Sequence, residues 1–387
     1  MKNLTTNILS FFLIASSLLA GEFSFGQAWQ KNYGGDIVFG DVEQTIDGGF
    51  VSTRHASSVV FKVDGAGSEL WGYSAPAIYE NVFSYSLEVL TDGSIVAVGQ
   101  ASVSVPSYQQ YLMIVKLDNS GNVVWEKFQP VTNGAVGPFL ISSSPSGGFF
   151  IGGQYSFLLK VDDNGDQIWQ KTSDGMRGLV ATPDGGAAYL VNDNTTASDF
   201  LFVRKVDANG SQQWSRAFIG NGDLVGRQMT ATADGGFAVT GFDYNGSSSD
   251  YFILKTDSQG NQEFLQHFGP TSADAGQGIA QTQDGDYLVT GWSNLAGRVT
   301  RLTKLDAMGN VVWERNYDAG EGLAVKEVAN GNIILAARGL RLFYLNADGS
   351  IFQNTITGNI FEDTSSTVFF RQASPAWKID RLGQRPA

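Results

Sequence analysis

Two arginines, Arg177 and Arg227, hold equivalent positions in a repeated sequence, each seven residues before an Asp-Gly-Gly triplet. A guanidinium group donates hydrogen bonds in a planar fork, which suits a carboxylate or a phosphate. The chain has a net charge of −13, so two cations at matched positions predict a site for a negatively charged ligand. The alternative is that each arginine pairs with a loop carboxylate such as Asp174 or Asp223, because most ion pairs in proteins are structural.

The Asp-Gly-Gly triplet, or a variant of it, recurs seven times and indicates where the two arginines lie in the fold. It begins at Asp47, Asp92, Ser146, Asp184, Asp234, Asp284 and Asn330. The positions seven residues earlier are Gly40, Tyr85, Phe139, Arg177, Arg227, Gln277 and Leu323. Matching points of a repeat occupy matching points of its structural units, so we expect these seven residues to ring the mouth of a central channel.

Further candidates for ligand binding lie on loops whose length and sequence differ from one repeat to the next. Binding residues are concentrated on variable loops that a rigid scaffold positions. Aromatic side chains on such loops could stack on sugar rings or pack against a protein partner. The candidates on these loops are Tyr79, Tyr108, Tyr244, Trp292 and Arg298.

No arrangement of residues identifies a catalytic site, and the catalytic residues are unknown at this stage. The only two histidines, His55 and His267, lie in different repeats, which argues against a catalytic triad with histidine and against a histidine metal site. The acidic run at residues 162–166 lacks the spacing of a calcium loop, and we expect no metal. A glycosidase or lyase that uses a pair of carboxylates remains an alternative, because the variable loops carry several acidic residues. Examples are Glu80, Asp193, Asp223 and Asp274.

A second signature marks the same units: Lys, then Asp at +2, Gly at +5 and Trp or Phe near +9. Its copies begin at Lys62, Lys116, Lys160, Lys205, Lys255, Lys304 and, in degraded form, Tyr344. Alternating apolar and polar residues, as at 237–241, predict strands between the glycine-rich turns. Successive aromatic positions are 44 to 54 residues apart, the length of a four-stranded propeller blade. One aromatic residue per blade is expected to fill the gap between neighbouring blades.

The sequence therefore predicts an all-β fold, a β-propeller of four-stranded blades, with eight blades favoured and seven as the alternative. Residues 29–35 resemble an outermost strand with no strands before it. Residues 377–383 resemble a third strand with no strand after it. If these two segments shared a blade, the N-terminal strand would close the ring and leave no sheet edge exposed. The seven-blade alternative stays open because no Asp-Gly-Gly triplet lies between Phe352 and Lys378.

The recurrence of Asp, Gly and Trp across the last turn of each unit resembles the tryptophan-docking propellers, typified by quinoprotein-type repeats, over residues 29–383. It is also similar to exported bacterial repeat proteins, most of which have no assigned activity, and more weakly to the Asp-box of sialidases. The resemblance implies a scaffold rather than a chemistry. Quinoprotein dehydrogenases commonly use adjacent cysteines beside their cofactor, and this chain has no cysteine, so the resemblance implies no cofactor here.

The N-terminus predicts export. Residues 8–20 form an apolar run that is too short to span a bilayer as a stable helix and suits the core of a signal peptide, which we place at residues 1–28. Residues 29–387 then form a single propeller domain that is secreted or periplasmic, has no membrane span and is expected to be a monomer. The acidic composition argues against nucleic acid as a partner.

These observations favour an exported, non-catalytic binding or scaffold propeller that engages a protein or a glycan through its long-loop face. The alternative is a glycan-active hydrolase or lyase that acts on acidic sugars at the channel mouth, where Arg177 and Arg227 would hold the sugar.

Overall fold

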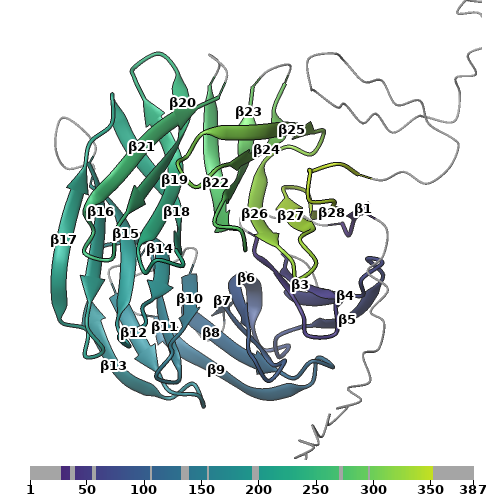
Figure 1. Ribbon diagram of the computed structural model, residues 1–387. Helices are drawn as coiled ribbons and strands as arrows, with labels where there is room; N and C mark the ends of the chain where they lie inside the picture. Colours follow the sequence, from purple (N-terminus) through teal and green to yellow (C-terminus); the bar gives the residue numbers. More distant parts are fainter. Residues whose placement is uncertain are drawn as a thin grey trace, which may run out of the picture.

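Seven antiparallel sheets of four strands each make up the fold. The computed structural model describes residues 28–351, apart from 35–39, 55–57, 105–106, 132–138, 155–156, 194–199, 270–272 and 295–296. Figure 1 shows the sheets arranged like blades around a central axis, which makes the described chain a seven-bladed β-propeller. Across these residues, no helix has the length and apolar character needed to cross a membrane.

Within blades 1 to 6 the strands follow one another in chain order from the channel outward. Blades 1 and 2 contain β2 (Val42–Gln44), β3 (Phe50–Thr53), β4 (Val60–Val63), β5 (Glu69–Tyr73), β6 (Glu80–Val89), β7 (Ile95–Val103), β8 (Gln109–Leu117) and β9 (Val123–Val131). Blades 3 and 4 contain β10 (Phe139–Ser143), β11 (Phe149–Gly153), β12 (Phe157–Val161), β13 (Gln167–Thr172), β14 (Met176–Ala181), β15 (Ala187–Asp193), β16 (Phe200–Val206) and β17 (Gln212–Phe218). Blades 5 and 6 contain β18 (Asp223–Ala231), β19 (Phe237–Tyr244), β20 (Ser249–Thr256), β21 (Gln262–Phe268), β22 (Asp274–Gln281), β23 (Tyr287–Ser293), β24 (Val299–Leu305) and β25 (Val311–Tyr317).

Blade 7 joins the two ends of the described chain. It contains β26 (Gly322–Glu327), β27 (Ile333–Ala337), β28 (Arg341–Leu345) and, as its outermost strand, β1 (Trp29–Asn32). Strand β1 is antiparallel to β28, and Trp29 lies opposite Tyr344. The N-terminal strand therefore closes the ring as predicted, but it completes the blade of the seventh repeat.

The favoured count of eight blades is thus corrected to seven. The prediction gave β1 a partner in residues 377–383, whereas β28 offers a free outer edge and β1 occupies it. Once that edge is paired, an eighth blade would have to break the joint between blades 7 and 1. Residues 377–383 and the predicted signal peptide, apart from Ala28, lie outside the described residues.

Each outermost strand carries an aromatic ring that packs on a glycine in the last turn of the next blade. A Cβ atom added to any of these glycines would lie within about 3 Å of the ring. The pairs, in blade order from blade 7, are Trp29 on Gly67, Trp71 on Gly121, Trp125 on Gly165, Trp169 on Gly210, Trp214 on Gly260, Phe264 on Gly309 and Trp313 on Gly349. Four of the indoles also donate Nε1–H to a backbone carbonyl of the same turn, at 2.8 to 3.2 Å. The aromatic positions thus join neighbouring blades, as predicted.

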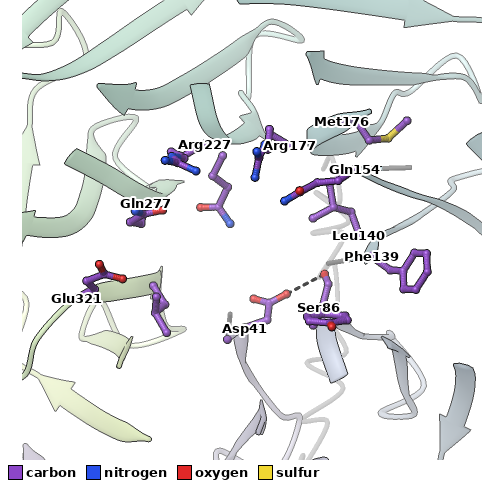
Figure 2. A pocket seen from close by; sticks show the side chains of 14 residues that line it. Asp41, Ser86, Phe139, Leu140, Gln154, Met176, Arg177, Arg227, Gln277 and Glu321 are labelled. Carbon is purple, nitrogen blue, oxygen red and sulfur yellow. Dashed lines mark hydrogen bonds between the residues drawn. The ribbon is translucent and has the colours of Figure 1, made fainter. Parts of the chain in front are cut away.

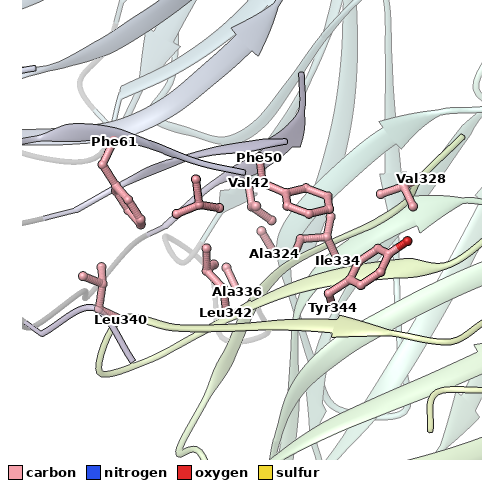
Figure 3. Packing of buried hydrophobic residues seen from close by; sticks show 11 residues of the cluster. Val42, Phe50, Phe61, Ala324, Val328, Ile334, Ala336, Leu340, Leu342 and Tyr344 are labelled. Atoms are coloured by element: carbon pink, nitrogen blue, oxygen red, sulfur yellow. The ribbon is translucent and has the colours of Figure 1, made fainter. Parts of the chain in front are cut away.

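The joint between blades 7 and 1 is packed as a hydrophobic core (Figure 3). Phe50 and Phe61 of blade 1 face Leu342 and Tyr344 of blade 7, and all four side chains are buried. The rings of Phe50 and Tyr344 have their centroids 5.4 Å apart. Ring closure is therefore stabilised by apolar burial as well as by strand pairing.

The lysine of the Lys-x-Asp signature pairs with the aspartate of the Asp-Gly triplet and not with the aspartate two residues after it. Lys255 binds Asp234 at 2.7 Å, and Lys304 binds Asp284 at 3.0 Å; both aspartates belong to the Asp-Gly triplets. The signature aspartate closes its own turn instead, as Asp257 does by accepting hydrogen bonds from the backbone N–H groups of residues 259 and 261. Each repeated motif therefore fixes one of the two hairpins of its blade.

We expect Trp29→Ala to lower the free energy of unfolding by about 3 kcal/mol, because it removes a partly buried indole from the joint that closes the ring. Urea unfolding measures the change. Gln30→Ala, at an exposed position of the same strand, is the matched control and should change the value by less than about 0.5 kcal/mol. Equal effects of the two substitutions would show that β1 does not hold the ring.

The docking contact itself can be separated from backbone strain with two glycines. Gly210 and Gly285 both have positive φ, +76° and +88°, so alanine carries a similar backbone penalty at each, about 1 kcal/mol. A Cβ at residue 210 would lie 2.8 Å from the Trp169 ring, whereas nothing lies within 4 Å of one at residue 285. We expect Gly210→Ala to be the more destabilising by about 1–2 kcal/mol in urea unfolding. Equal losses would contradict the docking account.

Candidate functional site

A cavity of about 280 Å³ lies at one mouth of the central channel. It lies where the innermost strands begin, on the face that carries the variable loops. Its lining consists of Gly40, Asp41, Tyr85, Ser86, Phe139, Leu140, Gln154, Met176, Arg177, Arg227, Gln228, Gln277, Glu321 and Leu323 (Figure 2). All seven positions that the triplet spacing aligned are in this lining. The structure therefore brings them together, while a ligand-binding role for the two arginines stays a prediction.

Five of these seven residues are the extra residues of β-bulges. The ladder between β14 and β15 pairs Met176 and Gly178 but skips Arg177, and the ladder between β18 and β19 skips Arg227 in the same way. The same irregularity occurs at Tyr85, Gln277 and Leu323. A bulged residue is left out of the strand ladder, and the local bend re-aims its side chain. Here the bulges present one side chain per blade to the channel mouth.

A sequence signal for these bulges exists in the glycines beside them. Gly178, Gly226, Gly276 and Gly322 each adjoin a bulged residue, and a Cβ at any of them would meet a neighbouring blade at 2.0 to 2.9 Å. Glycine inside a strand often marks a bulge or a close approach of two chains. Glycines inside the predicted innermost strands are therefore the sequence signal that marks these bulges.

Arg177 and Arg227 are partly buried cations for which the described part of the chain supplies no anionic partner. Among the described residues, no carboxylate lies within 4 Å of either guanidinium group, and neither side chain forms a hydrogen bond. Asp174, one of the partners considered for them, pairs with Arg204. Arg227 lies over the ring of Phe242 at 5.2 Å, and its buried Nε has no hydrogen-bond partner. The paired alternative is therefore not what the structure shows.

The electrostatics of the two arginines agree with this geometry. Burial lowers the pKa of Arg177. Burial also lowers the pKa of Arg227, and the positive charge of Arg177 lowers it further, while the negative charge of Glu321 has a smaller opposite effect. Arginine nevertheless remains protonated in proteins. Two neighbouring blades thus place like charges in the same partly desolvated cavity, an arrangement that an incoming anion would relieve.

The opposite wall of the cavity is acidic. Asp41 precedes β2 in blade 1 and accepts hydrogen bonds from the hydroxyl of Ser86 at 3.1 Å and from the backbone N–H groups of Val42 and Leu87 at 2.9 and 3.2 Å. In Figure 2, Asp41 and Ser86 lie across the cavity from Arg177 and Arg227. The site therefore has a cationic side and an anionic side.

Further along the channel, the innermost strands of blades 1, 2 and 7 carry a second group of charges. Lys326 pairs with Glu43 at 2.7 Å, and the charge of Glu43 raises the pKa of Lys326. Burial raises the pKa of Glu88 to about 7, together with the negative charges of Glu43 and Asp41. One lysine thus faces three carboxylates, which leaves this wall negative.

The loop candidates are placed apart from one another. Tyr79 stacks on Phe128 with ring centroids 3.8 Å apart, which takes up one of its faces. Tyr108 and Tyr244 are exposed, at 64% and 42% of their surface, and none of the three lines the cavity. These residues belong to the rim rather than to the channel mouth.

Trp292 and Arg298 lie beside the cavity without lining it. The Arg298 guanidinium lies 4.2 Å from the Trp292 ring centroid and binds the Glu321 carboxylate at 2.5 Å. Glu321 does line the cavity, and Arg338 approaches its other oxygen at 3.7 Å. Arg298 is therefore a partner of Glu321 and not a free anion receptor.

Metal and histidine chemistry find no support in the part of the chain that the structure describes. No group of three or more His, Cys, Asp or Glu side chains there could hold a metal ion. His267 binds the buried carboxylate of Asp243 at 2.7 Å, and Asp243 also accepts the backbone N–H groups of Asn221 and Gly222. This cluster holds the loop between blades 4 and 5. His55 lies outside the described residues.

A scan against protein-family models and a search of curated protein sequences find no match. Solved structures do resemble the chain. The WD40 β-propeller domain of Doa1 matches with a TM-score of 0.58 and 13% identity over 83% of this chain and 96% of that one. The Dos1 propeller matches with a TM-score of 0.53 and 11% identity over 81% and 78%.

BamB from Moraxella catarrhalis is more distant, with a TM-score of 0.48 and 15% identity over 83% and 99%. At identities this low the likeness to Doa1 and Dos1 shows the fold alone. The comparisons thus establish a β-propeller of four-stranded blades, and membership of the tryptophan-docking repeat family remains a prediction.

The raised pKa of Glu88 predicts a pH-dependent stability. The folded state holds the Glu88 proton more tightly than the unfolded chain, so the free energy of unfolding should fall as the pH rises from about 4.5 to about 7. Glu88→Gln removes the charge and should stabilise the protein by about 1–3 kcal/mol at pH 8 but hardly at pH 5, as measured by urea unfolding at both values. Glu80→Gln, at the exposed start of the same strand, is the control. A Glu88→Gln effect that is the same at both pH values would contradict the assignment.

Proposed function

We propose that this chain is a binding propeller whose channel mouth captures a negatively charged group of a protein or glycan partner. The observation that carries the proposal is the pair of partly buried guanidinium groups of Arg177 and Arg227, which have no carboxylate partner among the described residues. The buried arginines Arg54 and Arg301 have carboxylate partners, Glu69 at 2.8 Å and Glu314. Arg177 and Arg227 stand out because bulges aim them into a cavity instead.

The energetics favour a ligand in this position. A charged group removed from water is unfavourable unless it is paired and hydrogen-bonded, so these two residues lower the stability of the unliganded protein. A carboxylate or phosphate would accept charge-assisted hydrogen bonds from both guanidinium forks. Residues that lower stability and gain a partner only on binding are typical of functional sites.

The size of the cavity limits what enters it. A volume of about 280 Å³ suits one small chemical group, such as a chain terminus, a side chain or one sugar unit. The rest of a larger partner would lie on the rim, where Tyr108 and Tyr244 are exposed. We therefore infer a scaffold that anchors a partner by one charged group and contacts it further through the variable loops.

No specific observation favours the enzyme alternative. The loop carboxylates considered for it do not line the cavity: Asp274 is fully buried, and Glu80 accepts a hydrogen bond from Ser104 at 2.5 Å. Asp41, which does line it, is held by three hydrogen bonds. The proposal therefore concerns binding. The export of the protein and its monomeric state remain predictions from the sequence, the former from the apolar run at residues 8–20.

Calorimetric titration with inorganic phosphate and with acetate tests the proposal. Arg177→Ala and Arg227→Ala should each raise the dissociation constant about tenfold or more, since each removes a charge-assisted contact of about 1.5–3 kcal/mol. The lysine variants should recover part of the affinity. Arg216→Ala is the matched control, because Arg216 lies on the outermost strand of blade 4 over Trp214 and away from the cavity.

Urea unfolding of the same variants separates a binding role from a structural one. Without a ligand, Arg177→Ala should leave the free energy of unfolding unchanged or raise it, because it removes a like charge from beside Arg227. If the wild type bound neither anion, or if all three alanine variants bound alike, the proposed function would be wrong.

A further inference from the structure

The lining of the cavity is divided by charge across the ring. Arg177 and Arg227 come from blades 4 and 5, which lie opposite blade 1 in a ring of seven, and blade 1 supplies Asp41. Figure 2 shows the two arginines facing Asp41 and Ser86 across the open centre, with Glu321 to one side. The four charged groups in the lining are thus two cations and two carboxylates, and the cavity is bipolar rather than simply cationic.

Asp41 has capacity for another donor. A carboxylate offers about four lone-pair positions, and Asp41 uses three of them, for Val42, Ser86 and Leu87. No cation lies within 4 Å of its oxygens among the described residues. Glu321, in contrast, is engaged by Arg298 and Arg338. Asp41 is therefore the carboxylate of the lining that can take a positively charged group.

The charges behind Asp41 strengthen this preference. Along the channel wall below it, Glu43 and Glu88 are balanced only by Lys326, which binds Glu43 at 2.7 Å. With Glu43 paired to Lys326, the charge of Glu88, which is partial near pH 7 because burial raises its pKa to about 7, adds to that of Asp41 and leaves a negative potential on the side of blades 1 and 2. Such a potential attracts a cation more strongly than a neutral hydroxyl group.

We propose that the cavity takes a zwitterion, with its carboxylate on Arg177 and Arg227 and its ammonium group on Asp41. The inference rests on the proposed function, since it needs the arginine pair to bind an anion. Because the two charged sides lie on opposite walls of a cavity of about 280 Å³, the ligand carries its charges at the two ends of a spacer, the chemistry of an ω-amino acid or a short peptide.

The middle of the lining is suited to such a spacer. Leu140 and Leu323 supply apolar surface, and Gln154 and Gln277 supply neutral amides. The side-chain oxygen Oε1 of Gln228 accepts a hydrogen bond from the backbone N–H of Ile279 at 2.6 Å. This bond fixes the Gln228 side chain and leaves its NH₂ group free to donate to a ligand. A methylene chain or a peptide unit would meet matching groups between the two charged ends.

Three ligands of one length test the proposal on the full chain: pentanoate, 5-aminopentanoate and 5-hydroxypentanoate. Calorimetric titration should show that the amino compound binds about fivefold more tightly than pentanoate, and the hydroxy compound no more tightly than pentanoate. Asp41→Asn should bring the ratio of the amino compound to pentanoate close to one. Asp118→Asn, at an exposed turn, is the matched control and should retain the ratio.

Ser86→Lys is a second variant in case Asp41→Asn unfolds, because it places an ammonium group beside Asp41 without removing the hydrogen bonds from Val42 and Leu87. It should also abolish the preference for the amino compound. Equal binding of pentanoate and 5-aminopentanoate by the wild type would overturn the zwitterion proposal and leave the anion site standing. Tight binding of the hydroxy compound would contradict the zwitterion proposal and indicate a sugar acid as the ligand. Absence of binding by all three would overturn both proposals.

Discussion

The contact on which the rest of the structure depends is the packing of one aromatic ring on one glycine, repeated at every joint between blades. The ring belongs to the outermost strand of a blade, and the glycine lies at positive φ in the last turn of the next blade. Only a residue without a side chain allows the ring to approach the backbone this closely. Blades joined at this fixed point must curve into a ring, and Trp29 on Gly67 supplies the contact that closes it.

The innermost strands also pack closely on the neighbouring blades, at Gly178, Gly226, Gly276 and Gly322, but beside each of these glycines one position is free to vary at the channel. Five of the innermost strands carry a bulge, each with its extra residue turned toward the same mouth. The ladder on both sides of each bulge is intact, so the side chain at that position is not constrained by strand pairing. The same scaffold thus supports two arginines, a glutamine, a tyrosine and a leucine at equivalent points, and the chemistry of the mouth is decided by these choices.

The features that the sequence predicted are those that depend on spacing along the chain. Residues at the same position of each repeat occupy the same position of each blade. The seven residues that each precede an Asp-Gly triplet by seven positions could therefore be aligned from the sequence. The number of blades depends instead on which strand pairs with β1, a choice between segments at the far end of the chain that local spacing does not decide. The partner of the signature lysine does not follow from local spacing either, since Asp234 reaches Lys255 across a hairpin and not along the strand.

The pairing state of Arg177 and Arg227 could not be predicted from the sequence, which contains several aspartates near each of them. It follows from the bulges, which turn the guanidinium groups inward while Asp174 meets Arg204 outside. The acidic wall opposite them was also invisible, because Asp41, Glu43, Glu88 and Lys326 come from three blades and meet only in the closed ring.

The closure of blade 7 by β1 also determines how the chain must fold. Strand β1 is the first described strand to be synthesised, yet its partner β28 is the last, so β1 stays unpaired while the other blades form. The pairing of β1 with β28 is a contact of very high sequence separation, and contacts of that kind slow folding. Until they pair, β1 and the outer edge of β28 are both open strand edges. At high concentration, β1 of one molecule can complete the ring of another, and the same hydrogen bonds that seal the monomer would then link two chains by strand exchange.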